Sequence, residues 1–223
     1  MSQLSFPIAL PDGAPRFPQE PILRSASIED NYRWTAERAW GAGPCISWTL
    51  FNPSDADGKR DDPTMWRMTG FSYRWGFGSM IVTNVYPFIA SKPEALWKWR
   101  ENWRREDVAN SGGLWELDKS SMNAWLHNLD IVQCALKKSQ THVAAWGNGP
   151  DAGDLEEFID NVTWEWDTIG SARYRTTGDG GGRIPIEWKC LGKTGLGAPI
   201  HPLARGLYRV PVDAELQTWR KAA

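Results

Sequence analysis

The sequence predicts an α/β fold with one mostly parallel sheet, on the strength of three observations. Apolar runs of strand length at 45–51, 79–86 and 142–146 each lead into a polar or glycine turn. Segments with helical periodicity separate these runs, and strands that alternate with helices pair in parallel through right-handed crossovers. A chain of 223 residues can bury one sizeable core. We therefore expect a single domain.

The chain is expected to begin with an arm. Residues 1–26 are rich in proline, which disfavours regular structure, and are assigned to an N-terminal arm. Residues 27–223 form the domain, with insertions at about 93–120 and 151–185. The pattern at 27–40 fits either a strand or a short helix.

The remaining elements follow from periodicity and turn residues. Pro63 opens the first helix, because proline is favoured in a first helical turn. Apolar spacing predicts three more helices. They cover about 93–107, 120–138 and 154–159. After a strand or hairpin at 162–169 we expect a strand at 186–191 and a closing helix from about Asp213.

Charge and composition limit the classes of partner. The net charge is −2 and the pI about 6.0, which excludes a histone-like basic protein. Residues 171–209 nevertheless hold seven basic and two acidic side chains, a local patch that a polyanion can meet. The chain has 15 tryptophans, and we expect most in the core and some exposed for stacking.

The cysteines and histidines favour no metal site. Cys45, Cys134 and Cys190 are isolated in or beside apolar runs and are interpreted as buried, reduced thiols. No cysteine pair has the spacing of metal ligands, so neither a metal nor another cofactor is expected. With no signal-like or membrane-spanning segment, the sequence predicts a cytoplasmic protein without a membrane partner.

Polar residues at the strand ends carry the candidate chemistry. Asn52 and Pro53 end the first apolar run, and Asn84 lies at the end of the next, so both asparagines are expected at one edge of the sheet. Proline after Asn52 restricts its backbone and so holds its amide in place. An ordinary turn at a strand end is the alternative.

Four blocks in order resemble the uracil-DNA glycosylase superfamily. They are Leu-Phe-Asn52-Pro53-Ser54, Met-Ile-Val-Thr-Asn84, Val-Ala-Ala-Trp146-Gly147 and His201-Pro202-Leu203. The same motifs, with Asp61-Asp62-Pro63-Thr64, resemble a bacterial and phage domain family of unassigned function, interpreted as a branch of that superfamily. The resemblance implies a three-layer α/β/α fold around a mostly parallel sheet of four to five strands.

The resemblance also implies roles for individual residues. Asn52 positions the hydrolytic water, Asn84 bonds the pairing edge of a flipped base, and His201 stabilises the O2 anion as the glycosidic bond breaks. An aromatic side chain stacks on the base, with Phe77, Trp66 and Trp146 assigned to the binding site. Contacts to DNA are expected from Arg205, Lys193 and Arg183.

Two departures from the superfamily pattern change the expected chemistry. Asn52 replaces the carboxylate of the uracil-specific branch, so negative charge for an oxocarbenium must come from the loop that follows. Asp55 and Asp57 are the candidates assigned to catalysis, and Asp61 and Asp62 belong to the same loop. Ser54 stands where the uracil-specific branch has a tyrosine that blocks a C5 substituent, which implies a more open pocket.

The expected function is a monomeric DNA glycosylase that flips and excises a C5-substituted pyrimidine, such as a hypermodified base of phage DNA, in a setting of anti-phage defence. The alternatives are a non-catalytic reader of a modified base and a base-modifying transferase on the same fold. A nucleotide-binding α/β protein acting on free nucleosides is a further alternative. These differ in the salt dependence of binding and in release of a free base.

Overall fold

The computed structural model describes residues 17–19, 22–54, 59–109, 121–164, 166–169, 172–175, 182 and 184–221. Asp55, Asp57 and Arg183, which the sequence assigned to the site, lie outside these residues. None of the helices within the described ranges has the length and apolar character needed to cross a membrane.

One mixed sheet of seven strands organises the described residues, in the order β1-β2-β4-β3-β5-β8-β9. The strands are β1 (Leu23–Glu29), β2 (Tyr32–Ala39), β3 (Cys45–Leu50), β4 (Ser79–Asn84), β5 (Thr141–Ala144), β8 (Trp188–Cys190) and β9 (Gln217–Arg220). β4, β3, β5 and β8 run parallel, whereas β1, β2 and β9 join antiparallel. The expected sheet of four to five mostly parallel strands therefore corresponds to the centre alone.

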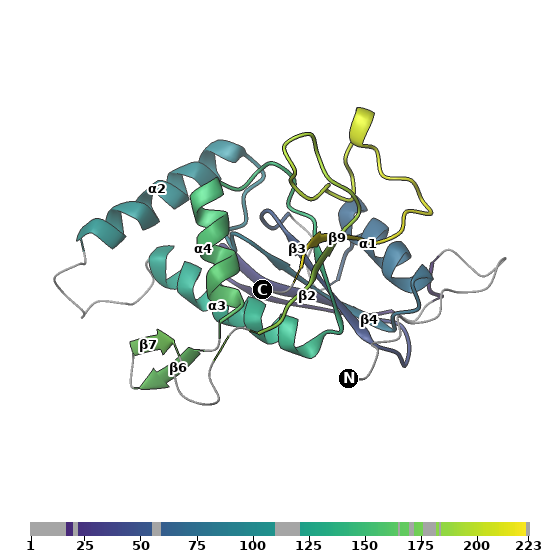
Figure 1. The fold of residues 1–223 in the computed structure, drawn as a ribbon, viewed down its shortest axis with the longest axis horizontal. Helices are drawn as coiled ribbons and strands as arrows, with labels where there is room; N and C mark the ends of the chain where they lie inside the picture. The colour runs from purple at the N-terminus through teal and green to yellow at the C-terminus, as the bar shows by residue number, and fades with distance from the viewer. Residues whose placement is uncertain are drawn as a thin grey trace.

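Helices cover both faces of the sheet, so the domain has three layers (Figure 1). α1 (Pro63–Arg74) packs on one face, and α2 (Pro93–Ala109), α3 (Ser121–Lys138) and α4 (Ala152–Val162) pack on the other. A separate hairpin of β6 (Trp166–Ile169) and β7 (Ala172–Arg175) projects away from the main sheet, and a short 3-10 helix, η1 (Gly206–Tyr208), lies in a late loop.

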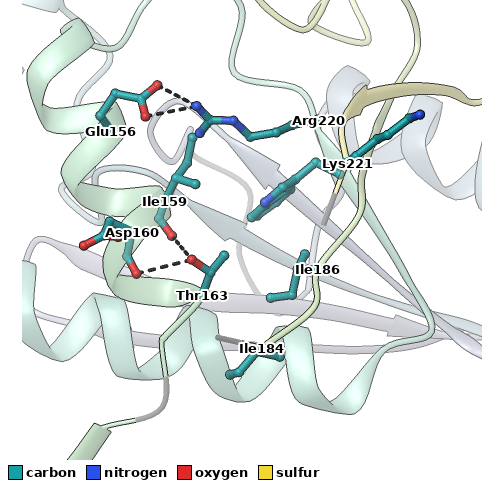
Figure 2. A pocket seen from close by; sticks show the side chains of 9 residues that line it. Glu156, Ile159, Asp160, Thr163, Ile184, Ile186, Arg220 and Lys221 are labelled. Carbon is teal, nitrogen blue, oxygen red and sulfur yellow. Dashed lines mark hydrogen bonds and ion pairs between the residues drawn. The ribbon is translucent and has the colours of Figure 1, made fainter. Parts of the chain in front are cut away.

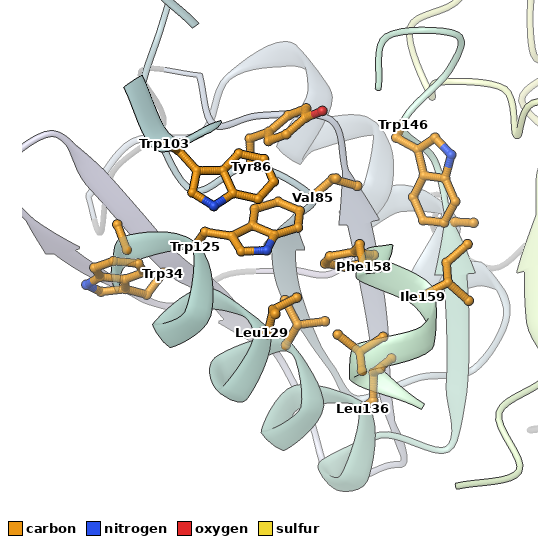
Figure 3. Close-up of a cluster of buried hydrophobic side chains, with 14 of the residues drawn as sticks. Trp34, Val85, Tyr86, Trp103, Trp125, Leu129, Leu136, Trp146, Phe158 and Ile159 are labelled. Carbon is orange, nitrogen blue, oxygen red and sulfur yellow. The ribbon is translucent and has the colours of Figure 1, made fainter. Parts of the chain in front are cut away.

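Alternation along the strands divides the core in two. On β3, Ile46, Trp48 and Leu50 face α1, where they meet Met65 and Met68. The opposite face buries a larger aromatic cluster, in which the rings of Trp103 and Trp125 stack with centroids 4.5 Å apart (Figure 3). Each buried large apolar side chain contributes about 1.5–3 kcal/mol. Burial of apolar side chains therefore contributes more stability on the face covered by α2, α3 and α4 than on the α1 face.

Two terminal segments differ from the expectation. The pattern at 27–40 belongs to a hairpin, and β1 begins at Leu23, so the arm ends earlier than residue 26. Asp30 adopts the left-handed φ of 50° that a tight hairpin turn requires. The closing helix expected from about Asp213 is wrong: residues 217–220 form β9, because their backbone pairs with the free edge of β8.

Candidate functional site

The carboxyl ends of the four parallel strands bring the strand-end motifs together. Asn52 follows β3, Asn84 ends β4, and Gly147 follows β5. The loop after β8 carries His201, and it is tied to the end of β5 by the Gly147 N–H, which donates to Pro199 O at 2.9 Å. Gly147 has a φ of 67°, where glycine is favoured. Open α/β sheets bind ligands at this edge.

Asn52 is oriented by its own amide hydrogens. Its Nδ2 donates to Ala90 O at 2.9 Å and to Pro53 O at 3.2 Å. The two N–H groups are thus committed to backbone carbonyls, and Oδ1 is the part of the amide that can accept a hydrogen bond from a water or ligand. These two hydrogen bonds hold the amide in place.

Asn84 has the least satisfied side chain of this group. It lies on the same face of β4 as Met80 and Val82, toward α1, with an exposed fraction of 0%. Neither Nδ2 nor Oδ1 has a hydrogen-bond partner. An amide buried without partners costs about 1–3 kcal/mol by mutational measures. Such a donor and acceptor at the ligand edge of a sheet point to a ligand that pairs with them.

Asp62 and Ser54 connect the first loop to α1. Asp62 is the N-cap of α1, and its Oδ1 accepts the N–H of Met65 at 2.7 Å. Its Oδ2 accepts the hydroxyl of the exposed Ser54. Asp61 is held differently, because Arg38 and Arg24 donate to its two oxygens at 2.6 and 3.0 Å. Of the two described aspartates, Asp61 anchors the loop and Asp62 faces Ser54.

Arg33 is a site residue that the sequence analysis missed. It is 1% exposed, and its Nη1 donates to Ser54 O at 3.4 Å. The register of the β1–β2 pair shifts at Trp34, which turns Arg33 onto the α1 face of the sheet. Burial lowers the pKa of Arg33 to about 10, and the negative charge of Asp62 opposes this shift. The only sequence signal is a basic residue between aromatic neighbours in a strand.

The hydrogen bonding of His201 assigns its tautomer. The Leu203 N–H donates to its Nδ1 at 3.1 Å, so the ring proton is assigned to Nε2. Burial lowers the pKa of the His201 imidazole below its ordinary value, against the opposing charge of Asp62. The imidazole therefore offers an Nε2–H donor, which suits it to stabilise a developing oxyanion.

The loop after His201 is fixed at its base and exposed at its tip. Arg67 of α1 donates to Pro202 O at 3.1 Å and also to Val210 O, so one guanidinium joins the two ends of the loop. At the tip, Leu207 is 91% exposed. Arg205 and Arg209 flank it and are exposed as well. The loop thus presents an apolar tip between two cations, near the strand ends.

The expected aromatic residues are not brought to this edge as a group. Phe77 precedes β4 and lies at the opposite edge of the sheet, where its carbonyl accepts the Trp40 indole N–H at 2.7 Å. Trp66 is 46% exposed on the outer side of α1 and packs on Phe17. Trp146 is buried on the α2–α4 face, opposite Asn84. None of these three therefore stacks on a ligand that Asn84 binds in this conformation.

The described DNA-contact candidates separate in the same way. Arg205 is exposed in the loop after His201. The Lys193 ammonium is also exposed but donates to the Trp219 carbonyl at 3.3 Å, which holds it beside β9. Arg205 thus remains available at the tip beside Leu207, whereas Lys193 is turned toward the last strand.

A separate pocket of about 310 Å³ lies between α4 and the end of β9 (Figure 2). Isoleucine side chains line its inner part, and the ion pair of Glu156 with Arg220 crosses its rim. None of the strand-end residues lines this pocket. Across the described ranges, no group of three or more His, Cys, Asp or Glu side chains is arranged to hold a metal ion.

Together the fold and the site define a three-layer α/β protein with a polar site at the carboxyl ends of its parallel strands. The chain belongs to the family described as "Protein of unknown function (DUF1643)", which matches residues 33–203. The match begins at Arg33 and includes the strand-end residues as far as His201. No curated protein and no solved structure matches the chain significantly.

Proposed function

We propose that this protein is a DNA glycosylase that flips a C5-substituted pyrimidine out of DNA and hydrolyses its N-glycosidic bond. The observation that carries the proposal is Asn84, whose buried amide has an unpaired donor and an unpaired acceptor at the ligand edge of the sheet. A pyrimidine presents the complementary pair of groups on its Watson–Crick edge. Four motifs that resemble the uracil-DNA glycosylase superfamily supply independent support.

Each of the other strand-end groups has a part in this reaction. The Oδ1 of Asn52 accepts a hydrogen from the attacking water and so orients it. The Nε2–H of His201 donates to O2 of the departing base, on which negative charge develops as the bond breaks. One such donor, held in place before the reaction, accelerates comparable reactions by about 10²–10³-fold.

The exposed loop after His201 suits a DNA partner. A flipped base leaves a gap in the stack, and extrusion costs a few kcal/mol. In the proposed complex the exposed Leu207 fills this gap, and the exposed Arg205 and Arg209 contact the flanking phosphates. Binding to DNA should therefore weaken steeply with salt, whereas binding to a free nucleoside should not.

Ser54 leaves room beside the base for a C5 substituent. A tyrosine at this position fills that space, so Ser54→Tyr should abolish release of a bulky base while sparing release of uracil. Ser54→Ala, which removes the hydroxyl and adds no volume, shows how much of any loss comes from the hydroxyl alone. Equal activity of Ser54→Tyr and wild type on the bulky base would show that Ser54 does not border the substituent.

The direct test is incubation of the protein with duplex and single-stranded DNA containing uracil, 5-hydroxymethylpyrimidines or their glucosylated forms. Alkali cleavage locates abasic sites, and mass analysis identifies released bases. We expect release that is lost in Asn52→Ala, Asn84→Ala and His201→Ala and retained in His127→Ala, an exposed histidine of α3. Tight binding without release would instead favour the reader of a modified base, which needs Asn84 but neither Asn52 nor His201.

A further inference from the structure

We propose that Asp62 is the carboxylate that accepts the proton of the attacking water; this assignment rests on the proposed glycosylase function. Asn52 is an amide and cannot take up a proton at neutral pH. The reaction therefore needs a base from elsewhere in the site. Asp62 follows the same strand-end turn, its Oδ2 accepts the Ser54 hydroxyl, and its negative charge acts on the His201 imidazole.

The hydrogen bonds of the two neighbouring aspartates separate their roles. Asp61 forms ion pairs with Arg24 and Arg38, and its side chain is only 2% exposed. These two cations balance its negative charge. Asp62 instead accepts hydrogen bonds from the Met65 amide and the Ser54 hydroxyl. Both donors are neutral, so they orient the Asp62 carboxylate without forming an ion pair with it.

Asp62 is also placed among the groups that the reaction uses. Its negative charge acts on the buried guanidinium of Arg33 and on the imidazole of His201. Arg33 and Asn84 lie on neighbouring strands, and both face α1. The Asp62 carboxylate therefore lies on the α1 side of the sheet, the side on which the Asn84 amide would bind the base. Ser54 fixes its orientation, because its hydroxyl holds Oδ2 while Met65 holds Oδ1.

The proposed step is balanced in atoms and charge. The C1′–N1 bond breaks and its electron pair leaves with the base, whose O2 is stabilised by the Nε2–H of His201. The oxygen of water, oriented by Asn52, bonds to C1′. The proton that this water loses passes to Asp62, which returns it to the anionic base. The products are the free base and an abasic sugar, and no cofactor is consumed.

The test is Asp62→Asn, because asparagine caps a helix about as well as aspartate and retains the shape of the side chain. Base release should fall by about 10²–10⁴-fold, the usual contribution of a general base. Binding to DNA that carries the same base on a 2′-fluoro sugar, which resists cleavage, should be retained. In Asp62→Ala, which vacates the space of the carboxylate, high concentrations of formate should restore part of the rate, an effect that a purely structural capping role does not produce.

The matched control is Asp151→Asn, the same exchange at the N-cap of α4, where Asp151 accepts the N–H groups of Gly153 and Asp154. It should leave base release unchanged. An Asp62→Asn protein that excises at the wild-type rate overturns the assignment of Asp62 and leaves the glycosylase function standing. Loss of rate in Asp62→Ala without rescue by formate also overturns it. If wild type releases no base from any of the DNAs, the glycosylase function fails and the assignment fails with it.

Discussion

Replacing Asn84 by leucine should make the protein more stable while abolishing the base binding that we propose. The two side chains have the same branched skeleton, and the exchange removes a buried amide that has no partner. Relief of that unpaired amide is worth about 1–3 kcal/mol. The larger methyl groups strain a close-packed site at a cost of typically about 1 kcal/mol or more. We expect a net gain of about 1 kcal/mol in the free energy of unfolding.

The matched control is Asn128→Leu on α3. Asn128 is equally buried, with an exposed fraction of 0%, but its Nδ2 donates to the carbonyls of Asn84 and Val85 at 3.0 and 3.1 Å. Leucine cannot donate to these two carbonyls, although the exchange also removes the unpaired Oδ1 of Asn128. The balance should lower the free energy of unfolding by about 2 kcal/mol.

Urea unfolding of the three proteins, followed by tryptophan fluorescence and by circular dichroism, measures both effects. For a chain of this length, 1 kcal/mol corresponds to a shift of about 2–4 °C in Tm, which a thermal scan resolves. The slopes of the unfolding curves must agree before the free energies are compared. If Asn84→Leu destabilises the protein as much as Asn128→Leu does, the Asn84 amide is paired in solution. The reasoning that its amide is kept for a ligand is then refuted.

Two further predictions concern stability. Burial lowers the pKa of His142 to about 4, so below pH 6.5 the unfolded chain binds a proton that the folded chain does not. The free energy of unfolding should therefore fall by about 2 kcal/mol from pH 7 to pH 5. Urea unfolding of His142→Gln should show a weaker dependence on pH. Arg100→Met should lower the free energy of unfolding by about 3–5 kcal/mol, because it removes the cation that binds the fully buried Asp154 at 2.5 Å. Arg220→Met should lower it by less than about 1 kcal/mol, because the ion pair of Arg220 with Glu156 is largely exposed. A calorimetric scan that finds equal losses for the two arginine variants would contradict the second prediction.

The central strands could be predicted because their signal is local. The runs that form β3, β4 and β5 are apolar on both faces, as buried parallel strands must be, and each meets a polar or glycine turn. The edge strands could not be predicted in this way, because their apolar residues do not recur with the spacing of either a strand or a helix. β9 is four residues long and depends on pairing with β8, a contact between residues about 30 apart. The turn at Asp30 and Asn31 was the available signal for the first hairpin, since both residues tolerate the backbone of a tight turn.

The candidate site divides along the same line between local and tertiary information. Asn52, Asn84 and His201 were recognisable because each follows a strand or opens a loop, and parallel strands bring such positions to one edge. Arg33 was not, because a shift of register in β2 decides which face it occupies. Phe77 lies away from the other candidates for a related reason: it is close to Asn84 in sequence, but the full length of β4 separates them. Proximity along the chain is a poor guide to a site that is built at strand ends.

The two faces of the sheet provide a way to separate stability from activity. The α2–α4 face holds the larger aromatic cluster and the ion pair of Arg100 with Asp154, so its variants should change unfolding with little effect on a reaction at the strand ends. The α1 face buries Arg33 and Asn84, polar groups that a core chosen for stability alone would exclude, and the half-buried Asp62 caps α1 on the same side. Variants there should change binding or catalysis, and Asn84→Leu should do so while raising stability. If Asn84 had only a structural role, Asn84→Leu could not raise the free energy of unfolding and at the same time abolish base release.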